Sequence, residues 1–164
     1  IVLMLTYDHG PATKNQGLSG NVVISLLVAA VILYGAAGVG GFDIPVIWWI
    51  FGVVFLTNLA REMVKDCMDM ESDAGSRNTL PMKYGKEKVR MAAYVVLMAA
   101  LVCLYIPFWK GPFQFGQLAI QLPAILTLIT LNGPLYQGKD ALVAGRIRIA
   151  MLMGLLSFIV ASVL

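Results

Sequence analysis

Charge is scarce in this sequence, and so are the residues that build zinc sites and disulfides. Asp, Glu, Lys and Arg make up 13% of its 164 residues, whereas 59% are hydrophobic, and the mean hydropathy is +0.81. A soluble globular domain carries about 25% charged residues, so this class is excluded. We expect Cys67 and Cys103 to be reduced and structural, and His9 to be a loop residue. The scattered net charge of +3 argues against a nucleic-acid partner.

Long uncharged runs dominate the chain. They cover residues 22–41, 44–60, 91–109, 111–138 and 149–164. Because roughly 20 apolar residues cross a bilayer as a helix, we expect five transmembrane helices, the second of them continued by Asn58 to Val64. The predicted fold is an all-α, multi-pass transmembrane helical bundle, with residues 1–164 forming a single transmembrane domain.

The charges that are present lie mostly on one side of the predicted bundle. With hairpins near Phe42–Asp43 and Lys110–Gly111, all 12 Lys and Arg residues except Lys110 fall on that side, as do all 9 acids except Asp43. The excess of Lys and Arg predicts that this side is cytoplasmic, in a protein of the cell membrane.

Four carboxylates recur at helical spacing near the end of the second predicted helix. Glu62, Asp66, Asp69 and Asp73 follow one another at intervals of four, three and four residues, which places them on one helix face. Each like-charge pair destabilises a helix by a few tenths of a kcal/mol, so the stripe requires a cation. Oxygen ligands of this kind favour Mg²⁺, which commonly takes one or two carboxylates plus a substrate phosphate.

The segment after the stripe is predicted to be a loop. Gly75 is expected to end the acidic helix, residues 76–85 to form the loop, and Lys86 to start the next helix. We expect Lys86, Lys88 and Arg90 to anchor that helix at anionic headgroups. In the span at 111–138 the side chains of Gln114, Gln117 and Gln121 share a face; they either hydrogen-bond a neighbouring helix, which we favour, or line a cavity.

The chain begins with an apolar stub, Ile1 to Thr6, followed directly by the polar stretch YDHGPATKNQG. The stub has the character of the end of a preceding transmembrane helix. We therefore expect the sequence to be the C-terminal part of a longer protein.

The acidic segment resembles a known motif. Arg61-Glu62-x-x-Lys65-Asp66-x-x-Asp69-x-x-x-Asp73, followed by Thr79-Leu80-Pro81 and Tyr84-Gly85-Lys86, is similar to the second aspartate-rich motif of the UbiA superfamily of intramembrane prenyltransferases, above all its archaeal branch. Members have nine helices, and the five spans here match the last five. The family's first motif, N-D-x-x-D-x-x-x-D, has no counterpart in the chain, which would therefore hold about half of such a site.

The resemblance implies roles for individual residues. Asp66, Asp69 and Asp73 would be the catalytic metal ligands. Tyr7 and Lys14 resemble a Tyr/Lys element that precedes the family's fifth helix, and would contact the diphosphate. Lys65 and Arg77 would either bind the diphosphate or balance the charge of the acids. Glu62 is a weaker ligand candidate, because Arg61 and Lys65 are close enough in sequence to pair with it.

The resemblance also implies a reaction: Mg²⁺-dependent transfer of a prenyl group from its diphosphate to a lipid-like acceptor in the bilayer. In the archaeal branch the donor is geranylgeranyl diphosphate and the acceptor is the hydroxyl of geranylgeranylglyceryl phosphate, which leads to ether lipids. Alternatives are an aromatic or quinone-precursor acceptor, half of a cation transporter, and a half-protein without activity. CDP-alcohol phosphotransferases are disfavoured, because their upstream D-G-x-x-A-R is missing from the chain.

Overall fold

The structure is a computed structural model that describes residues 17–75 and 77–164, and all regular structure in those ranges is helical. Its elements are α2 (Leu18–Gly38), α3 (Pro45–Asp69), α4 (Leu80–Tyr84), α5 (Lys86–Trp109), the 3₁₀ helix η2 (Phe115–Gln121), α6 (Leu122–Ile129), α7 (Asn132–Tyr136) and α8 (Asp140–Val163). Five helical segments are long and apolar enough to cross a membrane: α2, α3, α5, the combined segment Phe115–Tyr136, and α8. The predicted all-α, five-span bundle is confirmed.

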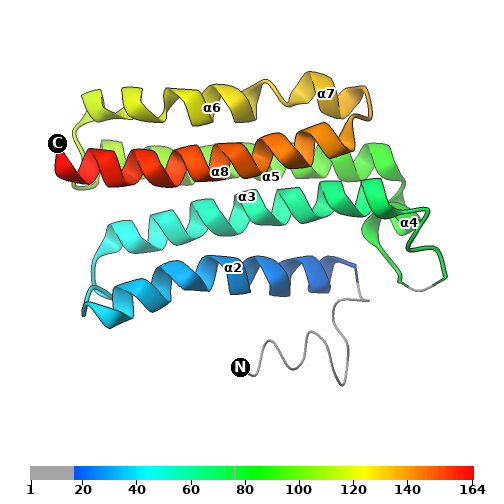
Figure 1. Cartoon of the computed structure of the whole chain (residues 1–164), viewed down its shortest axis with the longest axis horizontal. Helices are drawn as coiled ribbons and strands as arrows, with labels where there is room; N and C mark the ends of the chain where they lie inside the picture. The colour runs from blue at the N-terminus through cyan, green and yellow to red at the C-terminus, as the bar shows by residue number, and fades with distance from the viewer. Residues whose placement is uncertain (1–16, 76) are drawn as a thin grey trace.

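The helices lie side by side along the long axis of the molecule, with α3 in the middle (Figure 1). It packs against α2, α5 and α8, while α6 and α7 pack over α8 and α5. The centre of the bundle is filled by apolar side chains such as Val64, Leu97 and Ile147, none of which is exposed. The loop between α3 and α5, the start of α8 and the described start of α2 all meet at one end.

The segment between the second and third spans is more ordered than the sequence predicts. Within the range predicted as loop, Leu80–Tyr84 forms the short helix α4, with Pro81 in its first turn. Proline suits that position because the first N–H groups of a helix have no internal partner. Gly85, at φ 86°, lies between α4 and α5, and α5 starts at Lys86 as predicted.

The fourth span is not the single continuous helix expected over 111–138. It is divided into η2, α6 and α7, with Pro123 near the start of α6 and Pro134 inside α7. Proline lacks the N–H that a continuous helix uses, so interruptions at these places follow from the sequence. The last span also starts earlier than expected, at Asp140.

The glutamines of this broken span serve helix packing. Gln117 Nε2 donates to the carbonyl of Ala161 at 3.2 Å, and Gln121 Nε2 donates to that of Gly154 at 3.3 Å, both on α8. Gln114 and Gln117 form a capping box at the start of η2. The favoured interhelical interpretation is thus confirmed for Gln117 and Gln121.

Candidate functional site

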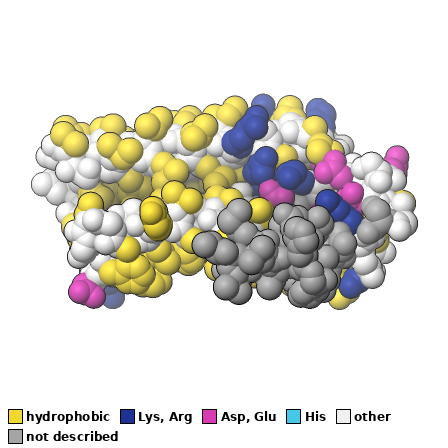
Figure 2. Space-filling model, turned by 60° about the horizontal axis from the view of Figure 1, so that its bottom comes forward, with side chains coloured by type: hydrophobic (Ala, Val, Ile, Leu, Met, Phe, Trp, Pro, Cys, Tyr) yellow, Lys and Arg dark blue, Asp and Glu magenta, His cyan; other side chains and the backbone are white. Residues whose placement is uncertain are grey.

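Charged side chains gather at one end of a face that is otherwise largely hydrophobic (Figure 2). The acids come from the last two turns of α3 and from the turn that follows it. Glu62, Asp66 and Asp69 lie on α3, which ends at Asp69, so the helix stops before the predicted Gly75. Gly75 instead lies in the following turn at φ 87°.

Asp73 nevertheless continues the predicted stripe. Its backbone N–H donates to the carbonyl of Asp69 at 2.9 Å, and the N–H of Arg77 donates to the carbonyl of Asp73 at 3.1 Å. Both bonds join residues four apart, as in an α-helix, so Asp73 follows Asp69 by about one helical turn. The predicted grouping of Asp66, Asp69 and Asp73 is therefore compatible with the backbone geometry.

Asp66 is held in place by a neighbouring helix. Asn21 Nδ2, on α2, donates to Asp66 Oδ2 at 2.8 Å, and Asn21 is 8% exposed. The network continues into the bundle, where Ser25 Oγ donates to the carbonyl of Asn21 and accepts from Asn58 Nδ2. Since the amide fixes one carboxylate oxygen, the other can serve as a ligand in a defined orientation.

The start of α2 reaches this end because glycine permits a close approach. Gly17 has φ +58°, and a Cβ there would lie 2.8 Å from the backbone oxygen of Asn78. The first turn of α2 therefore packs directly against the loop between α3 and α4. This contact brings Asn21 within reach of Asp66.

The basic residues near the stripe are already partly paired. Glu62 accepts from Arg61 Nη1 at 2.7 Å and from Lys65 Nζ at 3.0 Å, so Glu62 is a structural partner of these two cations. Arg77 Nη1 lies 3.7 Å from Asp73 Oδ2, and its side chain is 43% exposed. Lys65 and Arg77 thus balance the acids, while the exposed part of each side chain can still contact an anion. Tyr7 and Lys14 lie outside the described residues.

The donor set fits Mg²⁺ as an open site rather than a cage. Within residues 17–75 and 77–164, no three His, Cys, Asp or Glu side chains converge closely enough to hold a metal ion by themselves. Mg²⁺ characteristically keeps several waters and takes only one or two carboxylates plus substrate phosphates. Asp66, Asp69 and Asp73 are oxygen donors of this type on one side of a site, so they are suited to share an ion with a phosphate ligand.

A buried ion pair at the same end was missed by the sequence analysis. Arg90, on α5, donates from Nε and Nη2 to the two carboxylate oxygens of Asp140, on α8, at 2.8 and 2.6 Å. Their side chains are 17% and 8% exposed. Arg90 is therefore a clamp between two helices and not simply a headgroup anchor. The sequence offers one indirect signal for this pair. Arg90 and Asp140 have opposite charges, and each precedes a predicted span on the side predicted to be cytoplasmic.

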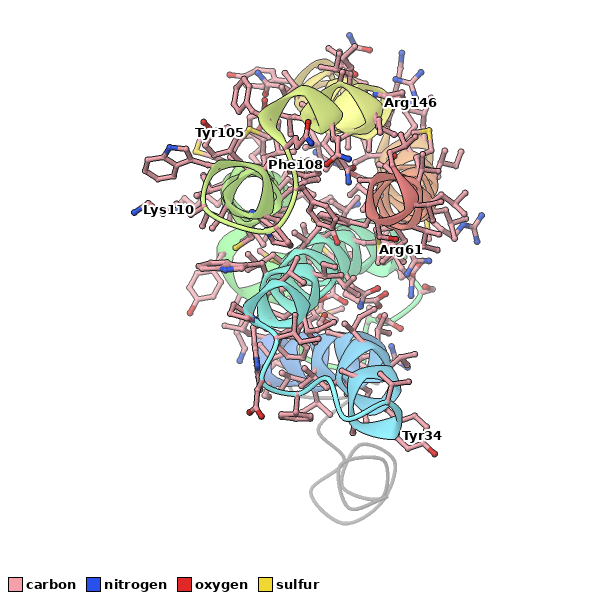
Figure 3. All side chains as sticks on the ribbon, turned by 90° about the vertical axis from the view of Figure 1, so that its left-hand side faces the viewer. Tyr34, Arg61, Tyr105, Phe108, Lys110 and Arg146 are labelled. Atoms are coloured by element: carbon pink, nitrogen blue, oxygen red, sulfur yellow. The ribbon has the colours of Figure 1, made fainter. Side chains whose placement is uncertain are left out.

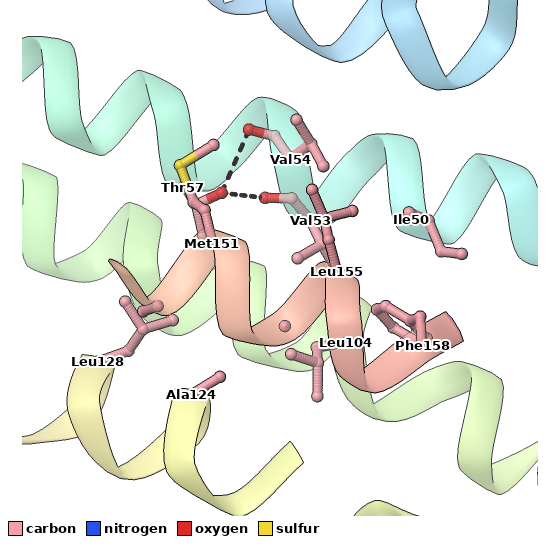
Figure 4. A pocket seen from close by; sticks show the side chains of 12 residues that line it. Ile50, Val53, Val54, Thr57, Leu104, Ala124, Leu128, Met151, Leu155 and Phe158 are labelled. Atoms are coloured by element: carbon pink, nitrogen blue, oxygen red, sulfur yellow. Dashed lines mark hydrogen bonds between the residues drawn. The ribbon is translucent and has the colours of Figure 1, made fainter. Parts of the chain in front are cut away.

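The apolar cavity inside the bundle is too small for a substrate (Figure 4). It lies between α3, α5, α6 and α8 and has a volume of about 20 Å³, enough for one water. Thr57, its polar lining residue, donates to the carbonyl of Val53 at 2.6 Å. This cavity is therefore not a substrate site.

Both cysteines are unpaired, as expected, and Cys67 is fully buried. Its Sγ lies 3.8 Å from the carbonyl oxygen of Lys86. It thus contacts the start of α5. This supports a structural role.

The fold defines a multi-pass helical membrane protein with a stripe of carboxylates at one end of its helices. The chain belongs to the UbiA prenyltransferase family, whose model matches residues 1–141. The resemblance drawn from the acidic motif is thereby confirmed.

The chain is similar to archaeal proteins named digeranylgeranylglyceryl phosphate synthase. The Methanopyrus kandleri protein is 36% identical over 159 residues, which cover 95% of this chain and 58% of the relative. The Pyrococcus horikoshii protein is 30% identical over 96% of this chain and 57% of its own length. The Sulfolobus acidocaldarius protein is 31% identical over 80% and 49%. The chain thus spans about half the length of the curated relatives it matches, and no solved structure matches it.

Proposed function

We infer that this chain supplies the C-terminal half of a Mg²⁺-dependent prenyltransferase that moves a geranylgeranyl group from its diphosphate to the hydroxyl of geranylgeranylglyceryl phosphate. The observation that carries this proposal is the orientation of Asp66 by Asn21 at the charged end of a UbiA-family bundle. The relatives' names, all of a glyceryl phosphate product, favour this acceptor over an aromatic or quinone precursor.

The carboxylates bind the diphosphate of the donor through the metal ion. Asp66, Asp69 and Asp73 would hold Mg²⁺ from this chain, and diphosphate oxygens and waters would complete its ligands. Bound Mg²⁺ would neutralise the diphosphate and stabilise the negative charge that develops on the leaving pyrophosphate. Lys65 and Arg77 contact the outer diphosphate oxygens, together with Lys14 and Tyr7.

Substitution then takes place at the allylic carbon of the donor. The bond between this carbon and the bridging diphosphate oxygen breaks, and its electron pair leaves with pyrophosphate. The acceptor hydroxyl oxygen forms the new ether bond, and its proton passes to the released pyrophosphate or to water. The hydrophobic surface beside the charged end (Figure 2) excludes water from the carbocation-like carbon, which would otherwise be hydrolysed.

The membrane placement follows from the charge distribution. With the Lys- and Arg-rich end on the cytoplasmic side of the cell membrane, the diphosphate is reached from the cytoplasm while both prenyl chains stay in the bilayer. A cation transporter, the alternative from another class, is disfavoured because the carboxylates lie at the end of α3 and not near the bilayer midplane.

The test is an assay of the complete natural polypeptide in membranes, with radiolabelled geranylgeranyl diphosphate, geranylgeranylglyceryl phosphate and Mg²⁺. We expect a labelled diether phosphate that is not formed when EDTA is present. Exclusive labelling of an aromatic acceptor would overturn the acceptor assignment. Mg²⁺ flux into liposomes without any transfer would favour the transporter.

A further inference from the structure

The facing surfaces of α3 and α8 bring two arginines together near the acidic stripe. The two helices run antiparallel, and Figure 4 shows Ile50 near Phe158 and Thr57 near Met151. Continuing this register by one helical turn pairs Arg61, on α3, with Ile147, on α8, so that the next residue, Arg148, lies close to Arg61. Figure 2 shows Lys and Arg side chains gathered over this end of the face.

Arg61 has unused hydrogen-bonding capacity. Its Nη1 is bonded to Glu62, but its Nε is buried and has no hydrogen-bond partner. A guanidinium presents Nε and Nη2 as a fork that matches two oxygens of a phosphate. One phosphate bound there would satisfy the orphaned Nε.

The surroundings carry excess positive charge. Arg148 is exposed and forms no ion pair with any described residue. Lys65 and Arg61 share the single carboxylate of Glu62. The three cations Arg61, Lys65 and Arg148 outnumber the two nearby acids Glu62 and Asp66 by one. The net positive charge favours an anion without requiring a metal.

Arg146 provides an internal comparison. Successive residues on a helix are rotated by about 100°, so Arg146 and Arg148 lie about 200° apart around α8. Arg148 faces the side of α3, as Met151 does, whereas Arg146 faces the side of α6. Figure 3 shows Arg61 and Arg146 on opposite sides of α8.

We propose that Arg61 and Arg148 bind the phosphate of the acceptor, apart from the carboxylates that hold the donor diphosphate. The proposal rests on the proposed function, since it assumes a phosphorylated glyceryl acceptor. Asp66 follows Arg61 by five residues, about 7.5 Å along the helix axis and about 140° around it. The glycerol backbone is short, so the accepting hydroxyl lies only a few bonds from the phosphate. A phosphate held at Arg61 therefore keeps the hydroxyl at the same end of α3 as the carboxylates.

The test compares phosphorylated and unphosphorylated acceptors in the complete polypeptide. Steady-state kinetics are measured with geranylgeranylglyceryl phosphate and with geranylgeranylglycerol, for wild type, Arg148→Gln, Arg148→Lys and Arg61→Gln. Arg146→Gln is the control, because it removes the same charge from the other side of the same helix. Arg148 is exposed, so its replacement leaves the fold intact.

We expect Arg148→Gln and Arg61→Gln to raise the KM for the phosphorylated acceptor about tenfold or more, as loss of a charge-assisted phosphate contact does. The KM for the donor and for geranylgeranylglycerol stays unchanged, and Arg148→Lys recovers part of the loss. Equal effects on both acceptors, or an effect of Arg146→Gln as large as that of Arg148→Gln, would overturn the assignment. Absence of transfer to either acceptor by the wild type would instead refute the proposed function itself.

Discussion

Asn21 provides the sharpest single test of how the site is built. Its amide donates to Asp66 Oδ2 at 2.8 Å, from a helix that carries none of the stripe carboxylates. Asn21→Ala removes the donor and leaves Asp66 free to rotate. If Asp66 is a Mg²⁺ ligand, this change weakens both the orientation of the ligand and the activity that depends on it.

Two independent estimates give the same loss of activity for Asn21→Ala. A hydrogen bond to a charged group contributes about 1.5–3 kcal/mol, and partners that orient metal ligands are worth about 10- to 100-fold in metal affinity or activity. Since about 1.4 kcal/mol corresponds to a factor of ten, both predict a drop in kcat/KM of about 10- to 100-fold. Part of the loss should be recovered by raising the Mg²⁺ concentration, because the mutation acts through the ligand.

The assay is prenyl transfer by the complete polypeptide, titrated with Mg²⁺. Ser25→Ala is the matched control, since Ser25 lies one turn further along α2 in the same network but does not touch Asp66. An Asn21→Ala enzyme with wild-type Mg²⁺ dependence would refute the reasoning. So would equal losses in Asn21→Ala and Ser25→Ala.

Four further predictions concern the rest of the charged end. Asp69→Asn and Asp73→Asn should each lower turnover by at least about 100-fold, roughly 2.7 kcal/mol, while Cys67→Ser stays near wild type; similar losses in all three would show that the stripe was misassigned. Arg90→Met should lower the free energy of unfolding by about 3–5 kcal/mol, because it leaves Asp140 buried and unpaired, whereas adding Asp140→Leu should restore most of the loss; thermal unfolding in detergent measures both, and no recovery in the double variant would contradict this account. Calorimetry should show tighter Mg²⁺ binding when a prenyl diphosphate analogue is present, and equal affinities would disprove the shared site. The chain expressed alone should insert in membranes but not transfer prenyl groups, and turnover at the full-length rate would show that one carboxylate stripe suffices.

The features that the sequence predicts well are those determined by local physics. Apolar runs identify the five spans because the bilayer requires about 20 such residues whatever their neighbours. The start of α5 at Lys86 follows from Gly85, whose φ of 86° is a conformation that glycine adopts readily. The acidic stripe depends only on helical periodicity, and its continuation to Asp73 is supported by local backbone bonds.

The features that the sequence analysis missed depend on pairs of residues far apart in the chain. Asn21 meets Asp66 across 45 positions and Arg90 meets Asp140 across 50, so neither pair leaves a periodic signal. An asparagine near the start of an apolar run and an aspartate two residues after a glycine are ordinary in themselves. The packing of α2 on α3 brings Asn21 to Asp66, and the position of α8 near α5 brings Asp140 to Arg90.

The contact between Asn21 and Asp66 also decides how hybrid enzymes should be made from this protein. Asn21 lies in the first turn of α2, yet it orients a carboxylate near the end of α3. A hybrid that takes its N-terminal part from the Methanopyrus kandleri relative should therefore change over before Gly17, so that α2 and α3 come from the same parent. A junction placed between α2 and α3 would combine an amide and a carboxylate that did not evolve together, and would lose the alignment even if every helix inserted correctly.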